Sequence, residues 1–166
     1  MGQTGASYYE VVQMSEIVEP VEQTEQETPR TSESVLNRAV ESVIALVNAM
    51  GNFADMTRGA LGSGDGLSCE VAPSVVESVF MDKNSYIPLT LAINGKHDDL
   101  QTLSDTLSII MDTLARSTTY PTGNGFEIVD IVYGNQPRII GREPNNKWLM
   151  ACDVVVKIYR KDEETT

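Results

Sequence analysis

The chain has 166 residues, 41% of them hydrophobic, so it can form one globular domain whose core needs no disulfide or metal. Its 12 basic and 24 acidic residues give a formal net charge of −12, which argues against nucleic-acid binding and against anionic membrane surfaces. Two cysteines and one histidine are too few for a disulfide scaffold or a thiolate metal cage. No apolar run has the length of a membrane helix, and no secretory signal is visible. We therefore expect a reduced, cytosolic protein with no cofactor, no metal and no specific nucleic-acid partner.

Acidic tails are expected on both sides of a single domain, which covers residues 32–161. Residues 1–31 contain six glutamates against one arginine, together with two prolines. This segment has too little apolar surface to offset the entropy of ordering it, so it is predicted to be disordered. The pairs Tyr8–Tyr9 and Val11–Val12 leave open the alternative of a short strand docked on a neighbour. Residues 162–166 form the C-terminal acidic tail.

The first half of the domain predicts one helix followed by two strands. Apolar residues recur at helical spacing between about Ser34 and Met50. Residues 52–66 end in a glycine-rich run and are expected to be a connector. Apolar and polar residues alternate from Leu67 to Ala72, and apolar residues share one face from Tyr86 to Asn94, which predicts two strands.

The second half predicts another helix and a long two-stranded ribbon. An apolar stripe from Leu100 to Leu114 indicates the helix, and the loop-forming run Tyr120–Gly125 follows it. Strands are predicted at Phe126–Tyr133 and Trp148–Arg160. Between them, residues 136–142 are expected to continue the ribbon past a bulge near Gly134 and Pro137, with residues 143–146 as its tip.

This order, α-β-β-α-β-β, predicts an α+β fold of two layers. We expect an antiparallel sheet of about four strands with both helices packed on one face.

No side chains are arranged for catalysis in any pattern that the sequence shows. His97 precedes a helix, beside Asp98 and Asp99, and is expected to be a solvated residue rather than an oriented base. Cys69 and Cys152 fall on the core faces of their strands, so we expect two buried thiols rather than a redox pair. The sequence therefore predicts that the protein is not an enzyme.

Two features favour an interaction surface. The predicted outer side of the last strand carries Leu149, Ala151, Val155 and Tyr159, and helices can cover only one face of the sheet. Residues 138–161 also hold six basic groups against two acidic ones in an otherwise acidic chain. This asymmetry favours head-to-tail contact between copies, although a charged ribbon can also serve solubility alone.

The C-terminal half resembles a known family through a set of short motifs. They are a Pro-Thr-Gly-Asn-Gly-aromatic turn at Pro121–Phe126, a Pro-Arg-Ile-Ile-Gly stretch at Pro137–Gly141, and an Asn-Lys-Trp strand entry at Asn146–Trp148. The last strand ends in Tyr159–Lys161, and Tyr86–Leu114 resembles the upstream strand, turn and helix of the same family. Together they resemble the minor capsid or tail-terminator proteins of long-tailed phages and prophages of Gram-positive bacteria. The acidic segment before Thr31 departs from that pattern.

The resemblance implies a structural protein that caps the head-proximal end of the virion tail and is assembled in the host bacterial cytoplasm. Its implied partners are its own copies in a ring, as a hexamer, together with the major tail tube protein and the head-completion or neck protein. Arg138, Arg142, Lys147 and Tyr159 are the predicted interface residues. Two alternatives stay open: a neck protein of the same virion region, and a non-viral binding or inhibitor module that uses its exposed sheet face.

Overall fold

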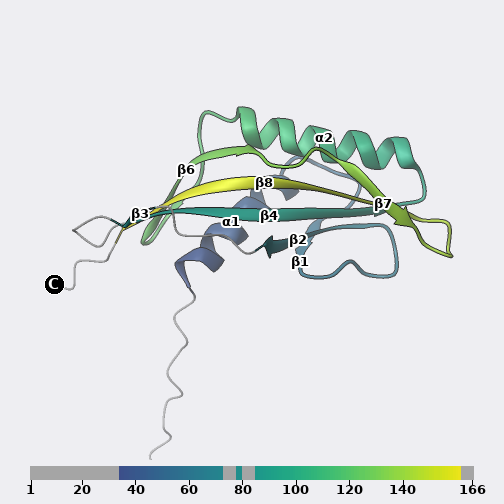
Figure 1. Ribbon diagram of the computed structural model, residues 1–166, viewed down its shortest axis with the longest axis horizontal. Coiled ribbons are helices and arrows are strands. Elements are labelled where there is room, and N and C mark those ends of the chain that lie inside the picture. The colour runs from purple at the N-terminus through teal and green to yellow at the C-terminus, as the bar shows by residue number, and fades with distance from the viewer. Residues whose placement is uncertain (1–33, 73–77, 80–84, 162–166) are drawn as a thin grey trace, which may run out of the picture. The chain divides into compact units, whose positions relative to one another are not determined.

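A computed structural model describes residues 34–72, 78–79 and 85–161 (Figure 1). The expected acidic tails, residues 1–31 and 162–166, lie outside these residues. Neither described helix is long and apolar enough to cross a bilayer. The elements in chain order are α1 (Val35–Asn48), β1 (Met56–Arg58), β2 (Gly66–Ala72), β3 (Ser78–Val79), β4 (Ser85–His97), α2 (Leu100–Arg116), β5 (Thr122–Gly123), β6 (Phe126–Tyr133), β7 (Arg138–Arg142) and β8 (Trp148–Arg160).

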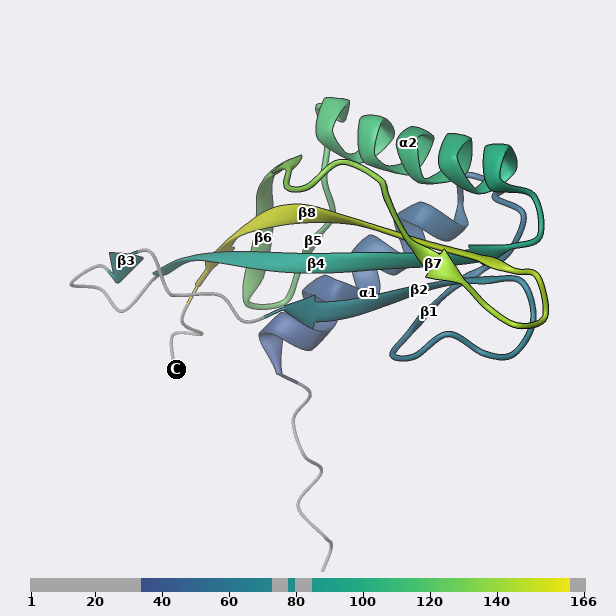
Figure 2. The ribbon, with the colours of Figure 1, turned by 45° about the vertical axis from the view of Figure 1, so that its right-hand side comes forward.

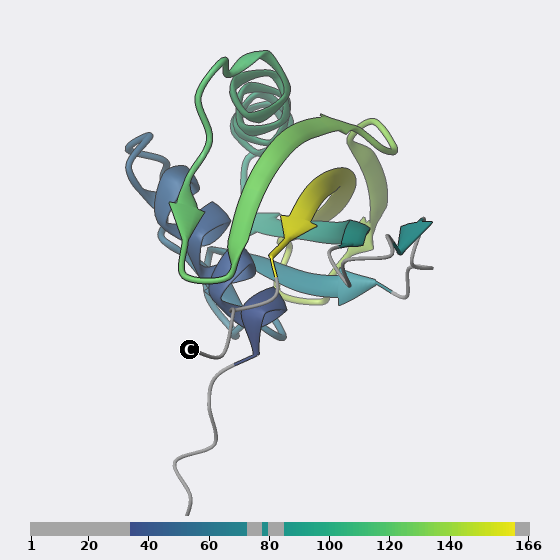
Figure 3. The same cartoon turned by 90° about the vertical axis from the view of Figure 1, so that its left-hand side faces the viewer.

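The fold class predicted from the sequence is wrong. Within the described residues the sheet has eight strands instead of about four, and it is mixed instead of antiparallel, so the order α-β-β-α-β-β does not hold. Its path runs β1-β2-β4-β8-β6-β5, with β3 beside β4 and β7 beside β8. β1 is parallel to β2, and all the other pairs are antiparallel. The sheet curls into a half-barrel, visible along the strands in Figure 3.

β8 organises this sheet because it pairs along its whole length. One side of β8 follows β4 from Ser85↔Arg160 to His97↔Trp148. The other side meets β6 over Val154–Arg160 and then β7 over Trp148–Ala151. β6 and β7 therefore lie one after the other along one edge of β8 (Figure 2), as predicted for a ribbon that continues past a bulge.

β1 depends on contacts that no local pattern shows. It has only three residues, and two of them are the polar Thr57 and Arg58. The Asn48 side chain at the end of α1 accepts a hydrogen bond from the Met56 amide at 2.6 Å and donates one to the Met56 carbonyl at 3.2 Å. A helix end thus holds the backbone of β1 beside β2. The prediction of a connector over residues 52–66 missed this strand for that reason.

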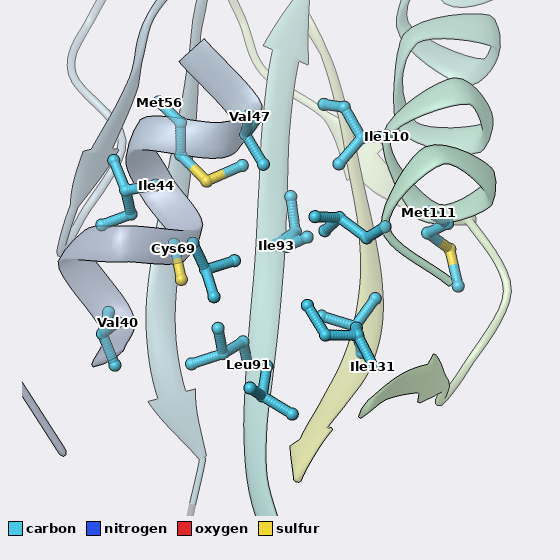
Figure 4. Packing of buried hydrophobic residues seen from close by; sticks show 14 of the residues in the cluster. Val40, Ile44, Val47, Met56, Cys69, Leu91, Ile93, Ile110, Met111 and Ile131 are labelled. Atoms are coloured by element: carbon cyan, nitrogen blue, oxygen red, sulfur yellow. The ribbon is translucent and has the colours of Figure 1, made fainter. Parts of the chain in front are cut away.

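The core lies between the two helices and one face of the sheet (Figure 4). The predicted core face of β8 is confirmed, since Met150, Cys152, Val154, Val156 and Ile158 are all buried. The close-up shows Val40 and Val47 of α1 and Ile110 and Met111 of α2 on either side of Leu91 and Ile93 of β4. Both helices therefore cover the same face, and that burial is the main stabilising contribution to this fold.

Candidate functional site

The four predicted interface residues occupy two distant places. Arg138 and Arg142 begin and end β7, and Lys147 directly precedes β8. Tyr159 lies near the far end of β8, a strand of 13 residues that spans about 40 Å. The structure therefore brings the three cations together at the β7–β8 hairpin and places Tyr159 elsewhere. Their role in assembly stays a prediction.

Each of the three cations has a partner within the chain. The Arg138 guanidinium lies 3.8 Å from the Asp153 carboxylate. The Lys147 ammonium forms an ion pair with the Asp65 carboxylate. The Arg142 guanidinium stacks over the Trp148 ring, 4.8 Å from its centroid, which adds a cation–π contact. These contacts order the hairpin, so its positive charge is presented in fixed positions.

Lys96 is the residue at this end of the sheet that the sequence analysis missed. It is only 4% exposed, and its ammonium donates to the Gly62 carbonyl at 2.8 Å and lies 2.7 Å from the Glu143 carboxylate. The hydrogen bond from Lys96 lowers the pKa of Glu143, and the hydrogen bond from Lys147 lowers the pKa of Asp65. The two lysines thus tie the hairpin to the loop of residues 59–65. The available signal was a lysine within a predicted buried strand that continues to residue 97.

One histidine and two carboxylates lie close together beside this network. In the described residues, ligand atoms of Asp65, His97 and Asp98 lie within 4.8 Å of one another. Nδ1 of His97 already accepts the Asp99 amide hydrogen at 2.9 Å, and Asp65 is paired with Lys147. The Asp65 carboxylate and Nδ1 of His97 are therefore already engaged within the chain. His97 is half-buried against the Phe53 ring, with centroids 4.8 Å apart, rather than solvated as predicted.

The second face of the sheet is less open than the sequence suggested. Ala151 is buried and Leu149, Val155 and Tyr159 are half-buried. The Tyr159 ring packs against Tyr86, with centroids 5.0 Å apart.

Ion pairs also cross this second face. The Lys157 ammonium lies 3.4 Å from Asp130, and Arg138 pairs with Asp153. The face is therefore a mixed polar and apolar surface, and its use by a partner stays a prediction.

Exposed apolar side chains gather instead on the edge formed by β6 and β7. Ile139 and Ile140 are 53% and 60% exposed, and Val129 and Tyr133 of β6 are exposed as well. Bulges explain two of them: the register with β8 skips Val129 between Ile128 and Asp130, and skips Ile140 between Ile139 and Gly141. Among the described strands, β7 pairs with β8 alone. Apolar side chains on an unpaired edge are a strong signal for association.

The two cysteines are buried on the core side of the sheet, as predicted. Burial raises the pKa of the Cys69 thiol to about 11 and that of the Cys152 thiol to about 12. Neither thiol is reactive at neutral pH, since the thiolate is the nucleophile.

Comparisons with solved structures find several likenesses, among them a weak one to a chain of a virion particle. No protein-family model matches the chain, and no curated protein matches it. A chain in the structure titled "Virion of native gene transfer agent (GTA) particle" is 13% identical, with a TM-score of 0.48. The match covers 74% of this chain and 92% of that one. At this level of similarity it assigns neither fold nor function.

Proposed function

We propose that this chain is a structural protein of a phage-like virion and, more specifically, a tail terminator. In this role copies of the chain form a ring, as a hexamer, on the head-proximal end of the tail tube. The ring contacts the tube protein on one side and the head-completion or neck protein on the other. The role needs no catalysis, no cofactor and no nucleic-acid binding, and we propose none.

The sequence resemblance supports this role through residues that meet in one place. The motif Pro137–Gly141 contributes most of β7, and the motif Asn146–Trp148 leads into β8. Ile139 of the first motif lies opposite Met150 of β8, and Trp148 of the second motif lies opposite Arg142 of β7. These two motifs thus lie on the two strands of a single hairpin.

The observation that carries the proposal is the exposed apolar edge of β6 and β7. A closed ring needs a heterologous interface, in which one surface of each copy meets a different surface of the next. The edge combines Ile139 and Ile140 with the fixed charges of Arg138 and Arg142. Such an edge fits an acidic neighbour, because the protomer carries a net charge of −12.

Mass photometry and electron micrographs of the full chain, across protein concentrations and with purified tail tubes, test the proposal. We expect rings in solution or on tube ends. The double variant Ile139→Asp/Ile140→Asp should abolish them while leaving the circular dichroism spectrum unchanged. Val71→Asp is the matched control, because Val71 is 43% exposed on β2, which β4 and β8 separate from this edge.

Charge reversal tests the predicted cations separately. Arg138→Glu/Arg142→Glu should also prevent assembly, whereas Arg58→Glu on β1, at the other end of the sheet path, should not. Monomers that bind no tube end at any concentration would contradict the proposal. Co-purification with heads rather than with headless tails would favour the neck protein instead.

A further inference from the structure

A hollow of about 230 Å³ lies on the second face of the sheet and shares Ile140 with the exposed edge of β6 and β7. Its walls come from segments far apart in the sequence: Leu61 in the loop of residues 59–65, Ile140 of β7 and Leu149 of β8. The hydrogen bond from Lys96 to the Gly62 carbonyl holds that loop in place. A cavity of about 150 Å³ holds a benzene-sized molecule, so this one admits a side chain with several methylene groups.

Three polar side chains line the hollow, those of Ser68, Glu70 and Asn94. Ser68 is 1% exposed, and its Oγ is buried without a hydrogen bond. Asn94 lies directly opposite Ser68 in the register of β2 and β4. Glu70 is two residues along the same face of β2. Within the described part of the chain, neither Asn94 nor Glu70 makes a side-chain hydrogen bond or ion pair.

An unpaired buried hydroxyl is costly, because it has lost its hydrogen bonds to water without replacing them. The buried Ser68 hydroxyl, beside the half-buried Asn94 and the exposed Glu70 carboxylate, therefore indicates an occupant with hydrogen-bond donors. The carboxylate of Glu70 disfavours an anion there. Lys96, two residues after Asn94 on β4, is already committed to Glu143 and Gly62.

We propose that this hollow binds a lysine or arginine side chain of a partner protein. The methylene stem lies against Leu61, Ile140 and Leu149, as long cationic side chains do on apolar surfaces. The charged head donates to Glu70 and Asn94, and the Ser68 hydroxyl accepts from it. This inference does not rest on the proposed function, since the hollow is complete within one copy.

Amide chemical shifts of the ¹⁵N-labelled full chain, titrated with blocked amino acids, provide the test. N-acetyl-lysine methylamide and the arginine analogue should give saturable shifts at residues 68–70, 94 and 140. N-acetyl-norleucine methylamide, which keeps the apolar stem without the charge, should bind at least tenfold more weakly. In Glu70→Gln the lysine probe should fall to the affinity of the norleucine probe. Asp105→Asn, at an exposed acid on α2, should leave the affinity unchanged.

Two results would overturn the inference. Equal affinity for the lysine and norleucine probes would mean that the polar groups recognise no cation. Shifts scattered over the acidic surface, without saturation at these positions, would mean that the hollow holds only water.

Discussion

Gly134 joins β6 to β7, at the point where the edge of the sheet passes from one strand to the next. Its amide donates to the Asp153 carbonyl of β8 at 2.9 Å. A Cβ at position 134 would lie 2.7 Å from that same carbonyl oxygen and 3.0 Å from the Asp153 Cβ. Because the obstacle is backbone, no rotamer change relieves the clash. Gly134→Ala must push the β6–β7 joint away from β8.

The expected cost follows from two opposing effects. Overpacking of this kind costs about 1–3 kcal/mol. Replacing glycine by alanine recovers about 0.4–1 kcal/mol through the unfolded chain, since Gly134 does not adopt the left-handed backbone conformation. We therefore expect Gly134→Ala to lower the free energy of unfolding by about 1.3 kcal/mol. Gly141→Ala is the matched control, because nothing lies within 4 Å of a Cβ there. It should stabilise the protein by about 0.5 kcal/mol.

Urea unfolding, followed by the fluorescence of the single tryptophan and by circular dichroism, measures both variants. A difference of about 1.8 kcal/mol between them, with equal denaturant slopes, is the expected result. Equal stabilities of Gly134→Ala and Gly141→Ala would refute the close approach of residue 134 to β8.

The remaining predictions concern the buried groups and the ion pairs. Lys96→Met should lower the free energy of unfolding, measured in urea, by about 2 kcal/mol, because two charge-assisted hydrogen bonds are lost. A change under about 0.5 kcal/mol would contradict a stabilising role of Lys96. The pKa values of Asp65 and Glu143 are lowered in the folded chain, so both carboxylates add to the free energy of unfolding above the ordinary carboxyl pKa of about 4. That contribution is lost as the pH falls through the folded pKa values. Asp65→Asn/Glu143→Gln should therefore lose less stability than the natural chain between about pH 5 and pH 2. Cys69 and Cys152 should resist a thiol reagent at pH 8 in the folded chain and react at once in urea, and rapid labelling of the native protein would argue against their burial.

Much of the local structure could be predicted because each long element carries its own apolar period. β6 and β8 match the predicted Phe126–Tyr133 and Trp148–Arg160, and α1 and α2 follow their apolar stripes. The predicted two-stranded ribbon also placed Arg138, Arg142 and Lys147 together, as they are on the β7–β8 hairpin. These features depend on residues close together in the chain, so the sequence determines them by itself.

Bulges decided what alternation alone could not. In β6 the sequence allowed either parity, and the bulge at Val129 lets both Ile128 and Ile131 face the core. In β7 the bulge at Ile140 leaves two successive isoleucines exposed. An inserted residue changes which side every later side chain faces, and its position depends on the partner strand.

The sequence by itself thus determined the helices, the long strands and the buried thiols. Within the described residues, only the tertiary structure decided the mixed eight-stranded sheet, the contacts of Lys96 and the buried, unpaired hydroxyl of Ser68. β1 forms because Asn48 binds its backbone, and the hollow forms because a loop, β2, β4, β7 and β8 meet. Contacts of this kind join residues distant in the chain, and no local periodicity encodes them.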